Sequence, residues 1–257
     1  MPTTLGAHHP RVEFARQLLS KKGRREHGRF SFEGPTLLDE ALRSRVAIEA
    51  LYATRRAYDD AAQVRALESS GTPVYLVDER TFAKLSDLDT PSGLLAVAPM
   101  LLHPLDELLA APGTILLLAD LNDPGNAGTL LRSAEAFGVD RAIFGSGGVE
   151  PYQPKVVRGA MGAIFRQRLA RAACEELQAA ARRHAFEVVG TAAAGEPLGR
   201  APFGPRTILA VGSERHGLGP WSALCSRLVA IPMAGPAESL NAAAAGSIAL
   251  YEATKRG

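Results

Sequence analysis

Long apolar runs and cysteines are both scarce in this sequence of 257 residues, and each shortage excludes a class of protein. No uninterrupted apolar run approaches the roughly 18 residues of a membrane-spanning helix, and the N-terminus lacks the apolar core of a secretion signal. The two cysteines, Cys174 and Cys225, have no CxxC spacing and lie in apolar or helical surroundings. We therefore expect a cytoplasmic protein without membrane contact, in which both cysteines are reduced and buried.

A large net charge is also missing: the formal value is +2, which by itself indicates no nucleic-acid partner. The basic residues are concentrated, however, between Arg11 and Arg29 and again between Lys155 and Arg183. One such stretch is usually only a solvated surface, but two of them on one chain favour contact with phosphate groups. The candidate phosphate contacts are Lys21, Lys22, Arg24, Arg25, Arg29 and Arg158.

Short strands alternate with helices in the first part of the chain, which predicts a small α/β domain. The expected strands cover residues 30–32, 47–53 and 73–77, and the expected helices cover 12–19, 35–43, 59–68 and 79–86. The polar run from Ser20 to Gly28 is expected to end the first helix. A proline-containing segment, residues 90–112, holds one strand candidate at 94–98 and marks the boundary between domains 1–100 and 101–257.

The second domain begins with the apolar run 114–119, which is typical of a strand buried in a parallel sheet. Further strands are expected at 142–145, 187–192, 207–212 and 228–231, with helices at 127–137, 155–162 and 175–184. The glycine cluster at 146–148 lacks the G-x-G-x-x-G order of a dinucleotide site. The predicted fold class is α/β: a small N-terminal α/β domain, then a C-terminal α/β domain on a parallel sheet.

Three of these strands end in loops rich in glycine or proline, at Gly190, Gly212 and Ile231. Ligands of open α/β sheets bind at the carboxyl ends of strands, so we expect these loops to form one pocket. The loop after Ile231 extends to residue 238, and Ser239 is a suitable N-cap for the alanine-rich helix that follows. The small side chains at 242–246 allow that helix to pack very close to a neighbour.

Three stretches, taken together and in order, carry a family resemblance. Asn126-Ala-Gly-Thr-Leu-Leu-Arg132, Val211-Gly-Ser-Glu-Arg-His-Gly-Leu218 and Ile231-Pro-Met…Ser239-Leu-Asn241 resemble the three motifs of the SpoU-TrmH family of RNA ribose 2′-O-methyltransferases. The resemblance covers residues 114–254 firmly. Residues 9–34 are similar, less specifically, to the start of that family's small substrate-binding domain, an RNA-binding fold.

The resemblance implies an enzyme that uses S-adenosyl-L-methionine, works as a homodimer and has its C-terminal chain threaded into a trefoil knot. The positions that match cofactor-binding residues are Gly212, Ile231 and Leu240, with Gly190, Thr191 and Met233 beside them. The positions that match the polar catalytic set are Asn126, Arg132, Glu214, Ser239 and Asn241.

Two positions depart from the family pattern. Ala243 stands where a second serine is common, two residues after Asn241, so the packing or hydrogen bonding beneath the cofactor must differ. His216 stands where a glycine or small polar residue is usual, and we expect it to be an exposed loop histidine without a role. Because Ser239 is present, the alanine at position 243 does not imply loss of activity.

The implied chemistry suits these residue types. A methyl group on a sulfonium is already activated, so the protein needs no metal and no covalent nucleophile, and base-carbon methylation through a cysteine adduct is disfavoured. The added N-terminal domain favours ribosomal RNA, 23S in particular, over transfer RNA as the partner. Two alternatives remain open: a methyltransferase of the same architecture that modifies a base nitrogen, and a non-catalytic RNA-binding protein that assists ribosome assembly.

Arg132 is expected to take part in deprotonating the target hydroxyl. A free arginine has a pKa above about 12 and is a poor base. Either the guanidinium orients an RNA phosphate that accepts the proton, or a tightly desolvated arginine accepts it directly. The sequence leaves open whether Arg132 acts in its own subunit or across a dimer.

Overall fold

A computed structural model describes residues 2–235 and 239–255, and the chain divides into two compact units. The first unit is Met1–Met100 with Tyr152–Phe165, and the second is Leu101–Pro151 with Arg166–Gly257. The return of residues 152–165 to the first unit was not expected from the sequence. Aromatic contacts explain it, because the ring centroids of Tyr152 and Phe30 are 4.4 Å apart and those of Phe165 and Phe32 are 5.1 Å apart.

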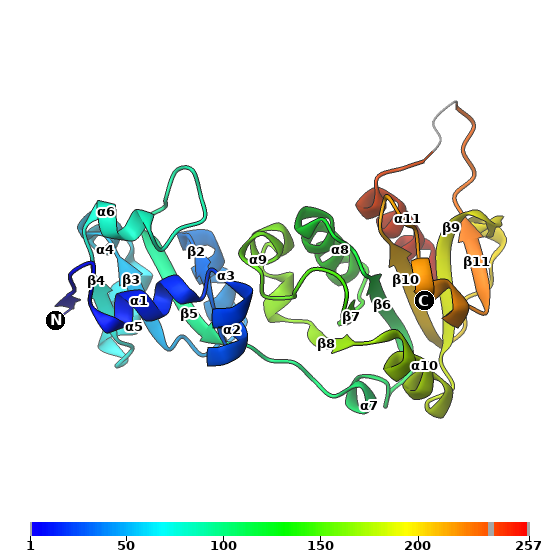
Figure 1. Cartoon of the computed structure of the whole chain (residues 1–257), viewed down its shortest axis with the longest axis horizontal. Helices are drawn as coiled ribbons and strands as arrows, with labels where there is room; N and C mark the ends of the chain where they lie inside the picture. The colour runs from blue at the N-terminus through cyan, green and yellow to red at the C-terminus, as the bar shows by residue number, and fades with distance from the viewer. Residues whose placement is uncertain (1, 236–238, 256–257) are drawn as a thin grey trace. The chain divides into compact units, whose positions relative to one another are not determined.

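A five-stranded mixed sheet forms the centre of the first unit, in the order β1-β4-β3-β5-β2 (Figure 1). Its strands are β1 (Thr3–Thr4), β2 (Arg29–Glu33), β3 (Ala50–Ala53), β4 (Val74–Leu76) and β5 (Leu94–Pro99). β5 pairs antiparallel with both β3 and β2, whereas β1, β4 and β3 are parallel. The strand candidate at 94–98 therefore lies inside this sheet and not in a connecting segment.

The helices of the first unit correct two sequence expectations. They are α1 (Pro10–Gln17), α2 (Lys21–His27), α3 (Pro35–Arg43), α4 (Arg55–Asp60), α5 (Ala62–Ser69), α6 (Glu79–Ala83) and α9 (Pro154–Ala160). The polar run after α1 is itself a helix, because the Ser20 side chain accepts a hydrogen bond from the Gly23 amide at 3.0 Å and Gly28 ends it with φ 63°. The single helix expected at 59–68 is two helices, because Ala61 is extended between them.

A six-stranded parallel sheet forms the second unit, in the order β11-β9-β10-β6-β7-β8. Its strands are β6 (Gly113–Ala119), β7 (Arg141–Gly145), β8 (Arg168–Ala172), β9 (Glu187–Pro197), β10 (Arg206–Gly212) and β11 (Arg227–Ala230). The expected parallel sheet is confirmed. β8 was missed, because its two arginines made the stretch read as part of a basic run.

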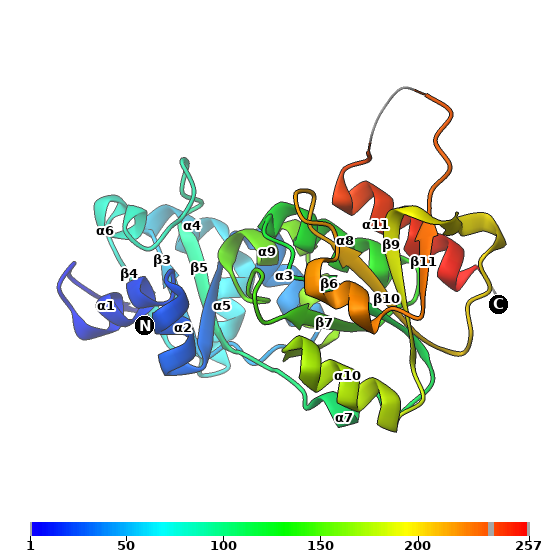
Figure 2. The same cartoon turned by 45° about the vertical axis from the view of Figure 1, so that its right-hand side comes forward.

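Helices cover both faces of this sheet, with α8 and α11 on one face and α10 on the other (Figures 1 and 2). The helices and short 3-10 turns of the unit are α7 (Leu105–Leu108), α8 (Pro124–Ala136), α10 (Cys174–Arg183), α11 (Ala242–Thr254), η2 (Leu198–Arg200) and η3 (Gly219–Leu224). A further turn, η1 (Ala163–Phe165), belongs to the first unit. No helix in residues 2–235 and 239–255 is long and apolar enough to cross a bilayer.

Close contact between α11 and the sheet depends on Gly246. A Cβ atom at that position would lie 2.5 Å from Cδ2 of Leu130 on α8 and 2.9 Å from Cγ2 of Val211 on β10. Such distances are too short for any side chain, so α11 sits at its present depth because residue 246 has none. The expectation that the alanine-rich helix packs very close to its neighbours is confirmed, and its N-terminus is thereby held at the carboxyl end of β10.

Candidate active site

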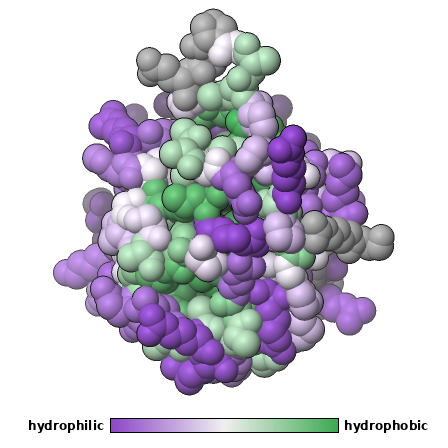
Figure 3. Space-filling model, turned by 90° about the vertical axis from the view of Figure 1, so that its right-hand side faces the viewer, coloured by the Kyte–Doolittle hydropathy of each residue, from purple (hydrophilic) through white to green (hydrophobic). Residues whose placement is uncertain are grey.

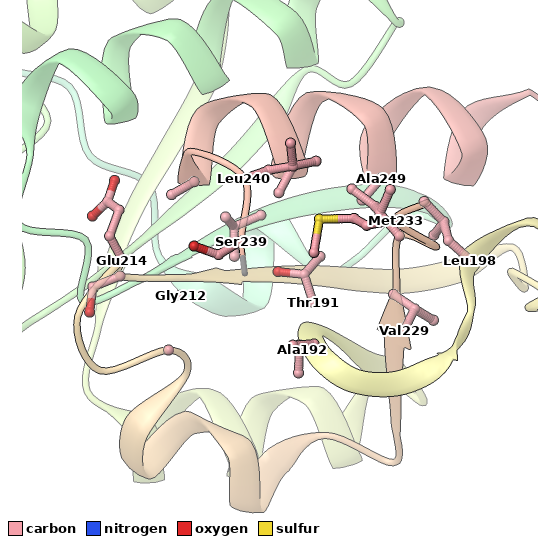
Figure 4. A pocket seen from close by; sticks show the side chains of 17 residues that line it. Thr191, Ala192, Leu198, Gly212, Glu214, Val229, Met233, Ser239, Leu240 and Ala249 are labelled. Atoms are coloured by element: carbon pink, nitrogen blue, oxygen red, sulfur yellow. The ribbon is translucent and has the colours of Figure 1, made fainter. Parts of the chain in front are cut away.

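One cavity of about 260 Å³ is lined by residues from the middle of β9, from the ends of β10 and β11 and the loops after them, and from α11. The segments after Gly190, Gly212 and Ile231 converge on this cavity as expected, but the segment after Gly190 lies within β9, which continues to Pro197, and is not a loop at the end of the strand. The lining residues of the cavity are Thr191, Ala192, Ala193, Leu198, Val211, Gly212, Ser213, Glu214, Gly217, Val229, Ile231, Met233, Ser239, Leu240, Ala242, Ala245 and Ala249. Glu214 stands at one end and Leu198 at the opposite end, with Thr191, Ser239 and Met233 between them (Figure 4).

A change of register between β9 and β11 makes room for the cavity. Gly190 pairs with Leu228, but the next paired residue, Val229, faces Glu196, so residues 191–195 of β9 bulge out of the ladder. This bulge supplies Thr191, Ala192 and Ala193 to the cavity wall. Gly190 itself does not line the cavity, since the space above its Cα is filled by Leu218 and Cys225.

The turn after β10 carries Glu214. Ser213 and Gly217 pair through two backbone hydrogen bonds of 2.9 Å, which closes a tight turn around residues 214–216. Gly212 must be a glycine here, because a Cβ would lie 2.2 Å from the carbonyl carbon of Gly217. The turn therefore folds back over the strand end, with Glu214 on the cavity wall and His216 exposed, as expected for His216.

A directed chain of hydrogen bonds joins three of the expected catalytic residues. Oδ1 of Asn241 accepts from the amides of Ala243 and Ala244 at 2.9 and 3.2 Å, which caps α11. Its amide nitrogen must therefore donate outward, and it donates to Oδ1 of Asn126 at 3.0 Å. The Asn126 amide nitrogen in turn donates to Oε1 of Glu214. Residues from three distant segments are thus held with a defined amide orientation at the edge of the cavity.

Asn241, and not Ser239, caps α11, which corrects the N-cap expected from the sequence. Ser239 and Leu240 precede the cap as exposed residues on the cavity wall. The expected loop from Ile231 falls partly outside the described residues, since 236–238 are not among them. Within the described part, Ile231 and Met233 line the cavity as expected. Ala243 is buried, and only its backbone takes part in the cap.

Arg132 is not brought to the cavity. It is an exposed residue of α8 and does not line the cavity. At about 100° per residue, its side chain leaves the helix roughly 120° away from that of Asn126. Within one subunit, Arg132 therefore belongs neither to the cavity nor to the series of hydrogen bonds through Asn126. Arg132 is also exposed, whereas direct acceptance of a proton would need a tightly desolvated guanidinium.

The expected phosphate contacts separate into three groups: exposed, buried, and paired with a carboxylate. Lys21, Lys22 and Arg25 are exposed on α2. Arg24 is only 3% exposed and donates to the carbonyls of Leu18 and Leu19 at 3.0 and 2.8 Å. Arg24 therefore closes the turn before α2 and is removed from the set of phosphate contacts, because a buried guanidinium cannot reach a phosphate.

Arg29 and Arg158 are each paired with a carboxylate. Arg29 makes a bidentate contact with Glu49 at 2.8 and 2.9 Å, and Arg158 donates to Asp87. The hydrogen bonds to Glu49 raise the pKa of Arg29 above its usual value. A phosphate would have to compete with these carboxylates, so the exposed lysines of α2, Lys21 and Lys22, are the stronger candidates.

Neither cysteine is poised to react. Cys225 packs under Gly190, away from the cavity lining, and burial raises the pKa of its thiol to about 11. Burial also raises the pKa of Cys174. Both thiols are therefore protonated at neutral pH, which is the unreactive form. In the described part of the chain, no group of three His, Cys, Asp or Glu residues is arranged to hold a metal ion.

Comparison with known proteins agrees with this geometry. The model of the SpoU rRNA Methylase family matches residues 113–251, and the model of an MRM3-like substrate binding domain matches residues 9–96. The chain belongs to the SpoU rRNA methylase family. The chain is 30% identical to the 23S rRNA (guanosine(2553)-2′-O)-methyltransferase RlmP of Bacillus subtilis, over 95% of this chain and 96% of that protein.

Solved structures of similar proteins superpose over nearly the whole chain. The AdoMet-bound rRNA methyltransferase from Sinorhizobium meliloti has a TM-score of 0.86 at 29% identity, covering 98% of this chain and 97% of that one. The SpoU methyltransferase AviRb from Streptomyces viridochromogenes, in complex with AdoMet, has a TM-score of 0.85 at 28% identity, covering 97% and 98%.

Some residues of this family site escaped sequence reasoning. Asp123 caps α8: its carboxylate accepts a hydrogen bond from the backbone amide of Asn126 at 2.8 Å, which fixes the position of the middle residue of the hydrogen-bonded chain. An N-cap aspartate before Pro124 at the first helical position is a recognisable signature and could have been found. Leu198, Val229 and Ala249 of the cavity wall carry no such signature, because apolar lining is indistinguishable from core in a sequence.

Asn241 has separable roles in stability and in the hydrogen-bonded chain. We expect Asn241→Ala to lower the free energy of unfolding by about 1 kcal/mol, since α11 loses its cap. Asn241→Asp should stay close to wild type, because a carboxylate still accepts from the helix amides. Asn126→Ala is the matched control, as it breaks the chain but spares the cap. Urea unfolding measures all three; equal stability of Asn241→Ala and wild type would contradict the capping role.

Proposed function

We propose that this protein transfers the methyl group of S-adenosyl-L-methionine to a ribose 2′-hydroxyl of ribosomal RNA, in the cytoplasm. The observation that carries the proposal is the chain from Asn241 through Asn126 to Glu214, which brings polar groups of three motifs to the edge of one cavity. The relative RlmP and the AdoMet-bound structural neighbours support the reaction and the cofactor. Of the RNA classes, 23S ribosomal RNA is the proposed substrate, because RlmP is named for it.

The lining of the cavity suits the cofactor. Apolar residues, among them Leu198, Val229 and Ile231, form one part of the wall, and such surfaces bind the flat adenine ring. Figure 3, which views the molecule from the right-hand side of Figure 1, shows a hydrophobic area in the middle of that face with hydrophilic side chains around it. We assign Gly212, Ile231 and Leu240 to the cofactor by their backbone, with Thr191 and Met233 beside it. Gly190 is assigned only a supporting role beneath the bulge.

Methyl transfer requires in-line alignment of the ribose hydroxyl with the sulfonium methyl and removal of one proton. Asn126 and Asn241 orient the ribose from fixed amides, and Ser239 shapes the wall against which it rests. Glu214 ends the hydrogen-bonded chain at the cavity and holds the Asn126 amide in place. The cofactor, when bound, supplies the activated methyl group, and the protein supplies alignment.

Arg132 acts across a homodimer in this proposal. α11 presents Ile248 and Tyr251 to solvent at 41% and 49% exposure, and the ring of Tyr251 contacts Phe137 at the end of α8. An apolar surface on the helix that packs beside Arg132's own helix favours pairing with a second copy. The guanidinium would then reach the partner's cavity and orient the RNA phosphate that accepts the proton. The trefoil knot belongs to the proposal as well, supported by the closeness of α11 to β10 at Gly246.

Nuclease mapping tests the reaction. Wild-type protein with labelled S-adenosyl-L-methionine should make ribosomal RNA resistant to cleavage at one ribose, whereas base methylation would leave cleavage intact. Leu240→Trp should abolish transfer, because the larger ring overfills the cavity. Leu101→Trp is the matched control at an exposed position outside the cavity. Cofactor titration by calorimetry should show loss of binding in Leu240→Trp alone, and unchanged affinity there would contradict the cofactor site.

Mixing two inactive variants tests the position of Arg132. We expect Arg132→Ala to lower methyl transfer by roughly 10² to 10⁴ with little change in cofactor affinity, and Arg132→Lys not to restore it. Arg132→Ala and Leu240→Trp, refolded together, should recover about a quarter of the wild-type activity, because half of the dimers then hold one complete site. Lack of recovery in mixed dimers would place Arg132 in its own subunit; near-normal activity of Arg132→Lys would limit its part to charge.

The exposed cations of α2 are proposed to bind RNA phosphates. Replacing Lys21, Lys22 and Arg25 with glutamine should lower the dependence of RNA affinity on salt, by about 0.7 to 0.9 in log–log slope for each lost contact. Arg43, exposed on α3 and paired with Glu40, serves as the control substitution. Filter binding at several salt concentrations gives the slope. A slope unchanged in the triple variant would leave this helix as a solvated surface.

A further inference from the structure

A second cavity, of about 530 Å³, lies within the first unit and has no part in the cofactor site. Its lining residues lie close to the ends of β2 and β3, at the start of β5, at the starts of α3 and α4, and at the start of α6. We propose that this cavity receives one unpaired guanine of the RNA substrate. The proposal rests on the proposed function, since it names a contact that the substrate makes away from the methylated ribose.

The cavity has a rigid, buried floor. Thr54, Gly93 and Leu94 form that floor, with Thr54 only 3% and Leu94 only 2% exposed. The Thr54 amide donates to the Gly93 carbonyl at 2.8 Å, which ties the start of α4 to the start of β5. A floor fixed by backbone pairing keeps its shape without a ligand, as preformed binding cavities do.

One wall is held by a buried carboxylate. Glu33, at 7% exposure, accepts from the Ser92 amide at 2.5 Å and from the Ser86 hydroxyl at 2.5 Å. Both oxygens of Glu33 are thereby used to fasten the two ends of the segment between Ser86 and Ser92. This segment includes Pro91, which lines the cavity, so the wall is also built before any ligand arrives.

The charges at the rim disfavour a phosphate as the occupant. Arg56 is the one cation among the lining residues, and it already pairs with Asp60 at 3.7 Å. Glu79, also a lining residue, is exposed and adds a further negative charge. Two carboxylates against one arginine repel an anion, so this cavity and the cationic helix α2 serve different parts of an RNA strand.

Hydrogen-bond acceptors at the rim favour a nucleobase with N–H donors. Gln63 donates its amide nitrogen to Asp39 at 2.9 Å, which leaves its oxygen as an acceptor. Glu79 and Asp60 accept only. Guanine carries an imino N–H and an amino group side by side on its Watson–Crick edge, and unpaired bases in RNA are read at that edge. Pro35, Pro91 and Ala57 provide apolar surface for the face of the ring.

Single-stranded probes test the cavity with the full-length protein. The probes are labelled nine-nucleotide oligouridylates with one central guanosine, inosine, adenosine or cytidine, and their affinities are read by fluorescence anisotropy. We expect the guanosine strand to bind roughly tenfold more tightly than the inosine strand, which lacks the amino group. Equal binding of all four strands, or no binding, would overturn the proposal.

Two pairs of variants locate the effect. Ala61→Phe fills the cavity and should remove the preference for guanosine without changing the salt slope, whereas Ala66→Phe, exposed on α5 outside the lining, should keep it. Glu79→Gln should weaken the preference, and Asp59→Asn, of the same charge change, should not. A preference that survives in Ala61→Phe and Glu79→Gln would show that the guanine binds elsewhere.

The outcome is separable from that of the proposed function. Cofactor affinity by calorimetry should be the same in all four variants, because the cavity lies in the other unit from the cofactor site. If wild-type protein methylates ribosomal RNA but shows no guanosine preference, only the cavity proposal fails. If guanosine is preferred but no methyl group is transferred, the proposed function fails and the cavity remains an RNA-binding site.

Discussion

The side-chain amide of Asn241 is the interaction on which the candidate site depends. Its oxygen is committed to the N-terminal amides of α11, so its nitrogen has only an outward direction in which to donate. That direction leads to Asn126 and from there to Glu214. The helix cap fixes the orientation of the Asn241 amide, and each hydrogen bond then fixes the orientation of the next group. The polar groups at the edge of the cavity therefore have one defined arrangement.

The cap can serve this purpose only because α11 lies close to the sheet. Gly246 lets the helix approach Val211 and Leu130 to a distance that no side chain would allow. The bulge of residues 191–195 has the opposite effect, because these residues leave the β9–β11 ladder and so create space for a ligand. Close packing on one side and a withdrawn strand on the other together produce a small, shaped cavity in an otherwise compact parallel sheet.

Two arginines, Arg24 and Arg141, are buried and therefore add little to the positive charge on the surface. Arg24 lies in the most basic stretch of the sequence, yet its guanidinium satisfies two carbonyl groups in the interior. Arg141 does the same in the second unit, donating to the carbonyls of Leu108, Ala111 and Pro112, and burial lowers its pKa. Fewer cationic side chains are therefore exposed to an RNA than the number of basic residues in these stretches indicates. In α2 the exposed ones are Lys21, Lys22 and Arg25.

The sequence by itself determined the parallel α/β domain, the close packing of an alanine-rich helix and the three motifs, because apolar periodicity and short polar motifs are local properties. It also placed Asn126, Glu214 and Asn241 in one site through family resemblance. Only the tertiary structure decided that Asn241 is the cap, that Arg24 is buried, that Arg132 lies off the cavity and that 152–165 returns to the first unit. Each of these features depends on contacts between residues that are far apart in the sequence. Such contacts produce no periodic pattern of residue types from which they could be predicted.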